Sequence, residues 1–228
     1  MSLNLEEVSL HAHLSDPKPV TSPESKPVGD ETVVDGTNPL SLEEMSELEE
    51  SNYHWKLKRY HEAAHAVVAH LLGFRPMYID NDVTQLDRRV LKFVHTANFV
   101  FRTREARVRA GEYAVMYIAG PAAEAKIRGE SLVDLRAESN IIIDEGCVGD
   151  YWRVNQLLVR VMCHSALEFS NEVRDHQLLL WEAKAIAILN NDSVWAAVES
   201  VADELELQLG TLGRDELLAA IERGLSSR

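Results

Sequence analysis

The 228-residue sequence has only two cysteines, Cys147 and Cys163. Two are too few for the disulfide framework of a small secreted domain, so we expect free thiols in a cytoplasmic protein. The sequence also lacks an apolar run approaching the ~20 residues of a membrane-spanning helix. Its first 20 residues have early acidic groups and no continuous apolar stretch, which argues against a signal peptide. We therefore expect no membrane insertion.

Basic residues are also scarce. The sequence has 23 Lys and Arg against 37 Asp and Glu, which gives a formal net charge of −14. Residues 1–50 contain 12 of the acidic residues and only two lysines, so the remainder is close to balanced. Binding to nucleic acid needs a basic surface that displaces counterions from phosphates. The composition therefore predicts no nucleic-acid partner.

Proline is unevenly distributed along the chain. Five of the seven prolines lie in the first 40 residues, where apolar periodicity is absent. Such a segment cannot bury enough apolar surface to offset the entropy of ordering it. We predict a disordered, acidic and proline-rich tail over residues 1–40. The remaining residues, 41–228, are predicted to form a single domain, since the 46% hydrophobic content is typical of globular proteins.

Helical periodicity dominates this domain. Ser41 to Glu44 form a capping box that predicts a short helix, and residues 53–72 predict a long helix capped by Gly73. Residues 77–79, 90–94 and 98–101 are short β-prone runs. Later helices are predicted at 104–118, 121–129, 150–169, 173–190, 193–209 and 214–224, with a loop at 130–149 in which 139–144 could form a strand. The predicted fold class is mainly α (α+β), with a small β-sheet after the first long helix.

Two histidines and a glutamate lie within that first long helix. His61-Glu62-Ala63-Ala64-His65 has the pattern H-E-x-x-H. Residues four apart lie on one face of a helix, so the two imidazoles can converge on a single Zn²⁺. Glu62 lies beside that face, where its carboxylate can take a proton from a water that zinc has made more acidic. The pattern predicts a zinc hydrolase with His61 and His65 as ligands and Glu62 as catalytic base.

A catalytic zinc site needs a third protein ligand and an open fourth position. Val68 and Leu71 stand where the extended metzincin pattern has glycine and histidine, so the ligand must come from farther along the chain. By chemistry alone six residues qualify, and their spacing does not choose among them: Glu124, Asp144, Glu145, Cys147, Asp150 and His164. Glu124 has a second possible role, as an acceptor for a ligand imidazole.

The segment from Arg59 to Leu72, RYHEAAHAVVAHLL, resembles the zinc helix of the FtsH-type membrane AAA proteases. Residues 118–124, IAGPAAE, followed by Gly129-Glu130, resemble the L-x-G-R-A-A-E-E…G-E helix of that family. Gly149-Asp150 stands where the family has S-N-D at the start of a helix. This resemblance covers residues 53–224. Ala64 and Pro121 replace the usual Gly and Arg of the family's motifs.

The resemblance implies a helical, zincin-like peptidase domain that hydrolyses peptides or unfolded proteins, and it makes Asp150 the third zinc ligand. The sequence contains no G-x-x-x-x-G-K-[ST] phosphate loop. We therefore expect peptidase activity that does not depend on the chain's own ATP hydrolysis. A homo-oligomer and a separate ATPase are the two kinds of protein partner that the resemblance suggests.

Two other functions are compatible with the sequence. The first is a catalytically silent binding or regulatory module, derived from an FtsH-type peptidase, that keeps zinc for structure. Glu62 argues against it, because a purely structural site does not need that carboxylate. The second is a scaffold without metal, for which the H-E-x-x-H match would be a coincidence.

Overall fold

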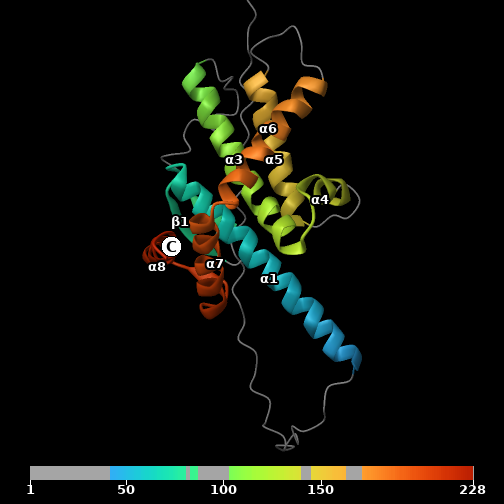
Figure 1. Ribbon diagram of the computed structural model, residues 1–228, viewed down its shortest axis with the longest axis vertical. Helices are drawn as coiled ribbons and strands as arrows, with labels where there is room; N and C mark the ends of the chain where they lie inside the picture. The colour runs from blue at the N-terminus through green and yellow to red at the C-terminus, as the bar shows by residue number, and fades with distance from the viewer. Residues whose placement is uncertain (1–41, 81–82, 87–102, 140–144, 163–170, 228) are drawn as a thin grey trace, which may run out of the picture. The chain divides into compact units, whose positions relative to one another are not determined.

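The computed structural model describes residues 42–80, 83–86, 103–139, 145–162 and 171–227. These residues form seven helices and a three-stranded antiparallel sheet, which confirms a mainly helical fold with a small sheet (Figure 1). The predicted tail at 1–40 and the β-prone runs at 90–94 and 98–101 lie outside the described residues. In sequence order the elements are α1 (Leu42–Leu71), β1 (Pro76–Asp80), β2 (Val83–Leu86), α3 (Arg104–Arg128), α4 (Leu132–Ser139), α5 (Glu145–Met162), α6 (Asn171–Leu189), α7 (Asp192–Leu207), β3 (Thr211–Leu212) and α8 (Arg214–Leu225).

The first helix is longer than predicted. The short helix expected at residue 41 and the helix expected over 53–72 are one continuous helix, α1. No proline or glycine interrupts the sequence between them, so nothing ends the first helix. The predicted C-terminal cap is confirmed, because Gly73 has a left-handed φ of 73°. Gly73 N–H donates to His70 O at 3.0 Å and Phe74 N–H donates to Ala69 O at 2.8 Å, which is the Schellman pattern.

Helix α3 corrects a second predicted boundary. The prediction of two helices that meet at Pro121 was wrong, since α3 runs from Arg104 to Arg128 with Pro121 inside it. Proline disfavours a helical conformation at the preceding residue, partly through contact with that residue's Cβ. Gly120 has no Cβ, so the helix continues through this position although Pro121 has no N–H to donate. Helix α3 ends at Gly129, whose φ is 72°.

The segment predicted as a loop at 130–149 is partly helical. It contains α4 and the first turn of α5, and α5 begins five residues before the predicted start at 150. Residue 139 ends α4, while the rest of the possible strand at 139–144 lies outside the described residues. Helices α6, α7 and α8 lie within a few residues of the predicted bounds.

The sheet has the order β2-β1-β3, with both pairs antiparallel. Strand β1 was predicted, whereas β2 and β3 were not. Strand β3 has only two residues and comes from the turn between α7 and α8, where it pairs with the end of β1. Strand β2 pairs with β1 through Ile79 and Thr84 and also contacts α1.

Helix α3 is the centre of the packing. It lies along α1 and also contacts α5 and α6, while α7 packs on α1 and α8 (Figure 1). The α1 and α3 faces are rich in buried alanines, which allow the two backbones to approach closely: Ala63, Ala64, Ala66, Ala114, Ala119, Ala122 and Ala123. Among the described helices, none combines the length and the apolar character needed to cross a membrane.

Candidate metal centre

The two histidines of the H-E-x-x-H pattern face the same point in the interior. His61 and His65 lie one turn apart on α1 and are only 5% and 6% exposed. Their Nε2 atoms are 2.9 Å apart, and their rings are nearly perpendicular, with an interplanar angle of 84°. The helical spacing thus brings both nitrogens to one place, as the sequence predicted.

The third member of this group comes from α5. Asp150 Oδ2 lies 2.9 Å from His61 Nε2 and 3.0 Å from His65 Nε2. The three atoms therefore form a nearly equilateral triangle. Among the described side chains of His, Cys, Asp and Glu, these three alone are grouped closely enough to hold a metal ion. The residues that the sequence and the resemblance together proposed as ligands are brought together by the fold.

The opposite nitrogen of each ring has a hydrogen-bond partner on α3. His65 Nδ1 lies 2.8 Å from the carbonyl oxygen of Met116, which can only accept, so Nδ1 carries the proton. His61 Nδ1 lies 2.5 Å from Glu124 Oε1, and Arg128 lies 3.7 Å from Oε2, which favours an ionised carboxylate that accepts from Nδ1–H. In the neutral rings both Nε2 atoms then have lone pairs directed into the triangle.

Three acceptors that converge without a donor repel one another unless a cation lies among them. The pKa shifts of His65 and Asp150 show how the charges in this group interact. Burial by itself lowers the pKa of His65, but the Asp150 carboxylate outweighs burial and the pKa is raised above its ordinary value. For Asp150, burial by itself raises the pKa, but His65 and His61 outweigh it, and the pKa is held well below its usual range. Both shifts favour positive charge at the centre of the triangle.

The positions of the two rings depend on the glycine at residue 120. A Cβ at this position would lie 2.5 Å from His65 Nε2 and 2.6 Å from His61 Nε2, well inside van der Waals contact. Met116, Gly120, Glu124 and Arg128 follow one another at intervals of four on α3, so one helix face orients both rings and leaves room beside them.

The donor set and its geometry fit a divalent metal. A tetrahedral zinc with bonds of ~2.0–2.1 Å separates its ligand atoms by about 3.3–3.4 Å, a few tenths of an ångström more than the distances between the three atoms here. Two imidazoles and one carboxylate leave a fourth position open, as in catalytic zinc sites. His61, His65 and Asp150 could therefore hold such an ion.

Glu62 is the other predicted functional residue, and it does not belong to the triangle. It is 8% exposed, and its Oε2 accepts hydrogen bonds from Thr84 N at 2.7 Å and from Thr84 Oγ1 at 2.8 Å. The carboxylate is thus directed toward β2, beside the face that carries the histidines.

The other candidates for the third ligand differ in their positions. Glu124 contacts the outer nitrogen of His61, so its place is behind the ligand and not in the triangle. Asp144 and His164 lie outside the described residues. Glu145 and Cys147 lie in the first turn of α5, and their side chains are outside the described part of the structure.

Sequence reasoning did not identify three contributors to this centre. Gly120 inside a helical pattern was a usable signal, because a glycine there usually has a packing or functional reason. The Met116 carbonyl has no signal of its own, since every residue has one. Thr84 is 22 residues from Glu62 in a four-residue strand, and nothing in its neighbourhood predicts the contact.

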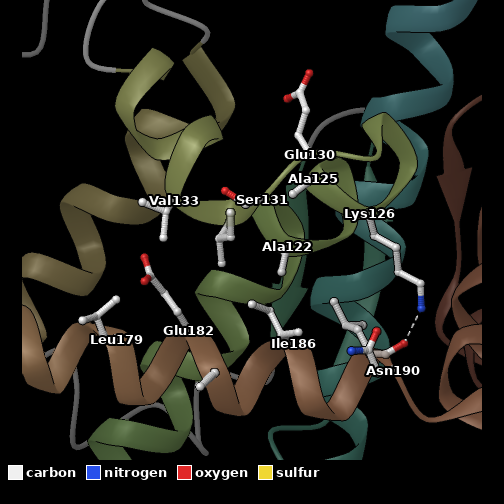
Figure 2. Close-up of a pocket in the computed structure, with 13 residues that line it drawn as sticks. Ala122, Ala125, Lys126, Glu130, Ser131, Val133, Leu179, Glu182, Ile186 and Asn190 are labelled. Carbon is white, nitrogen blue, oxygen red and sulfur yellow. Dashed lines mark hydrogen bonds between the residues drawn. The ribbon is translucent and has the colours of Figure 1, made fainter.

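A cavity of about 450 Å³ lies elsewhere, between α3, α4 and α6 (Figure 2). Its walls are mainly apolar, and Lys126 at its edge donates to Leu189 O at 2.8 Å. None of His61, His65 and Asp150 lines it. The cavity is therefore distinct from the candidate metal centre.

No protein-family model matches the chain, and no curated protein matches it. The resemblance to the FtsH-type proteases therefore depends on the residues quoted above and stays a prediction.

Proposed function

We propose that the protein is a zinc-dependent metallopeptidase with a zincin-like site, that His61, His65 and Asp150 bind the zinc, and that Glu62 is the catalytic base. The observation that carries this proposal is the convergence of three acceptor atoms, 2.9–3.0 Å apart, next to a buried glutamate on the same helix. When bound, zinc would supply a Lewis acid that acidifies a water and polarises a carbonyl.

The residues of the chain would orient the metal ligands, transfer the proton and bind the peptide. Met116 O and Glu124 orient the two imidazoles and, in the neutral rings, hold the proton on Nδ1 so that Nε2 is the atom that can bind a metal. Glu62 accepts the proton of the attacking water and returns it to the leaving amine. An extended peptide can pair with β2, which is the outermost strand at one end of the described sheet. Unfolded segments or peptides are therefore the proposed substrates.

A second function is favoured by one specific observation. Thr84 makes two hydrogen bonds to the Glu62 carboxylate, so Glu62 already has a structural use as a link between α1 and β2. A catalytically silent zinc-containing module, which binds or regulates another protein, would retain such a link without chemistry. Catalysis must therefore be measured directly.

The direct test is metal-dependent turnover. Full-length protein purified without chelator is expected to contain one zinc per chain and to cleave casein or a quenched fluorescent peptide. Chelation should abolish cleavage, and added zinc should restore it. Zinc-loaded protein that cleaves neither substrate would contradict the peptidase and favour the silent module. Protein that binds no zinc would contradict both.

The third ligand has its own prediction. Asp150→Ala is expected to weaken zinc binding at least about tenfold, because the zinc loses one ligand bond and the negative charge of the carboxylate. The matched controls Asp144→Ala and Glu145→Ala should leave the affinity unchanged. The measurement is a competition titration against a chromophoric chelator. If Glu124→Ala empties the site while Asp150→Ala leaves it full, Asp150 is not the ligand and a glutamate-liganded site replaces it.

A further inference from the structure

The Glu62 carboxylate is attached to the sheet by a single residue. Thr84 N–H donates to Glu62 Oε2 at 2.7 Å, and Thr84 Oγ1 lies 2.8 Å from the same oxygen. Thr84 Oγ1 also lies 3.0 Å from the backbone oxygen of Glu62. All three contacts join one residue of β2 to one residue of α1, so the strand and the proposed base are held in fixed relation.

These contacts distinguish the two carboxylate oxygens. A threonine hydroxyl has one proton, so it donates either to Oε2 or to the backbone oxygen, while the amide donates to Oε2 in both cases. Oε2 is therefore always held. Among the residues that the structure describes, none hydrogen-bonds to Oε1, which leaves this oxygen to accept a proton.

Orientation of this kind matters for a general base. A glutamate side chain has three rotatable bonds, and a base must come within ~2.6–3.2 Å of the proton it takes. Misplacement of a reacting group by ~1 Å can lower a rate by as much as about 10²-fold. The same strand is the outermost one at its end of the described sheet, where an extended peptide can pair, so Thr84 relates the position of the peptide to the position of the base.

We propose that Thr84 is a positioning residue for Glu62: it fixes Oε2, directs Oε1 toward the reacting water and couples the base to the strand that binds the peptide. This inference rests on the proposed peptidase function. Thr84 itself touches neither metal ligand nor reacting atom in the proposed reaction.

The kinetic test compares Thr84→Val with Thr84→Ser in zinc-loaded, full-length protein. Valine keeps the shape and the backbone N–H but removes the hydroxyl, so kcat should fall about tenfold with KM within about twofold of wild type. Serine keeps the hydroxyl and should retain kcat within about twofold. Thr211→Val is the matched control and should not change kcat, because it makes the same substitution on β3, the strand at the other end of the described sheet. Thr84→Ala is a second variant without the hydroxyl.

A readout independent of activity is the thermal unfolding midpoint. Thr84→Val should lower the midpoint by about 2–4 °C in wild type and by less in a Glu62→Ala background, where only the backbone oxygen of residue 62 remains as an acceptor for the hydroxyl. Equal shifts in both backgrounds would overturn the link between the Thr84 hydroxyl and the Glu62 carboxylate.

Failure of the positioning role can be distinguished from failure of the proposed peptidase function. If wild type cleaves peptides and Glu62→Gln does not, but Thr84→Val keeps the wild-type kcat, the positioning role is overturned while the peptidase stands. If zinc-loaded wild type cleaves nothing, the peptidase is overturned and the positioning role with it. An unfolding shift that depends on Glu62 would then identify the pair as a structural link.

Discussion

Replacing Glu62 by Gln is expected to lower peptide turnover by about 10²–10⁴-fold, the range for loss of a general base, with one zinc per chain retained. Glutamine has the same size, and its carbonyl oxygen can still accept from Thr84 N and Oγ1. It cannot take a proton at neutral pH. Zinc should stay bound, because Glu62 is not one of the three converging groups.

The measurement is kcat and KM on a fluorogenic peptide, together with metal analysis of the same samples. Glu112→Gln is the control, since Glu112 pairs with Arg109 on α3 and has no contact with the metal group. Turnover by Glu62→Gln at the wild-type rate would show that the cleavage does not use this base. Loss of zinc from Glu62→Gln would show instead that the residue stabilises the centre and does not act only in catalysis.

The part of the centre that the sequence predicted is the part that depends on local geometry. His61 and His65 are four residues apart, and a helix alone places them on one face. No tertiary information was needed for that. The cap at Gly73 was predictable for the same reason, because it depends on the few residues around it.

Asp150 is a different case. It is 89 residues from His61, and no periodicity relates the two positions. Chemistry alone left six candidates, and only the resemblance chose among them. The structure brings Asp150 to both imidazoles because α1 and α5 both pack against α3. The spacing of residues along the sequence gives no information about such long-range packing.

The two unpredicted strands have a related cause. Strand β2 has four residues and β3 has two, so neither is long enough to show a clear alternation of polar and apolar side chains. Both exist because β1 lies between them and pairs with each. Thr84 acquires its contact with Glu62 only through this pairing, so its proposed role could not be read from the sequence.

Two helices were predicted where the structure has the single helix α3. For this reason the residues that support the metal centre were not recognised as one helix face. Treating Pro121 as a helix start separated Met116 from Glu124 and removed the interval of four that joins them through Gly120. Gly120 explains both the continuation of the helix through Pro121 and the close approach of the two histidine rings. It relieves the contact with the following proline and leaves the space beside the two Nε2 atoms.

Replacing Gly120 by Ala is therefore expected to weaken zinc binding at least about 100-fold, the upper end for residues that support metal ligands. The new methyl group would lie 2.5–2.7 Å from atoms of His65 and His61, so a ring or the helix must move away from the binding geometry. Alanine is more favourable than glycine in a helix interior by roughly 0.5–1 kcal/mol, but its Cβ also contacts the following Pro121, so these two effects on folding oppose each other. We expect metal binding to be lost while the protein remains folded.

Gly111→Ala on the same helix is the matched control. Its Cβ would also be crowded, at 2.9 Å from Trp181 Nε1, but it is not among the residues that contact the metal group. Zinc affinity, measured by competition with a chromophoric chelator, should fall for Gly120→Ala and stay unchanged for Gly111→Ala, with circular dichroism showing both variants folded. Wild-type affinity in Gly120→Ala would contradict a metal centre at His61, His65 and Asp150, because the two rings cannot keep their present positions beside the added methyl group. Equal losses in both variants would assign the effect to distortion of α3 as a whole and contradict the specific role of Gly120.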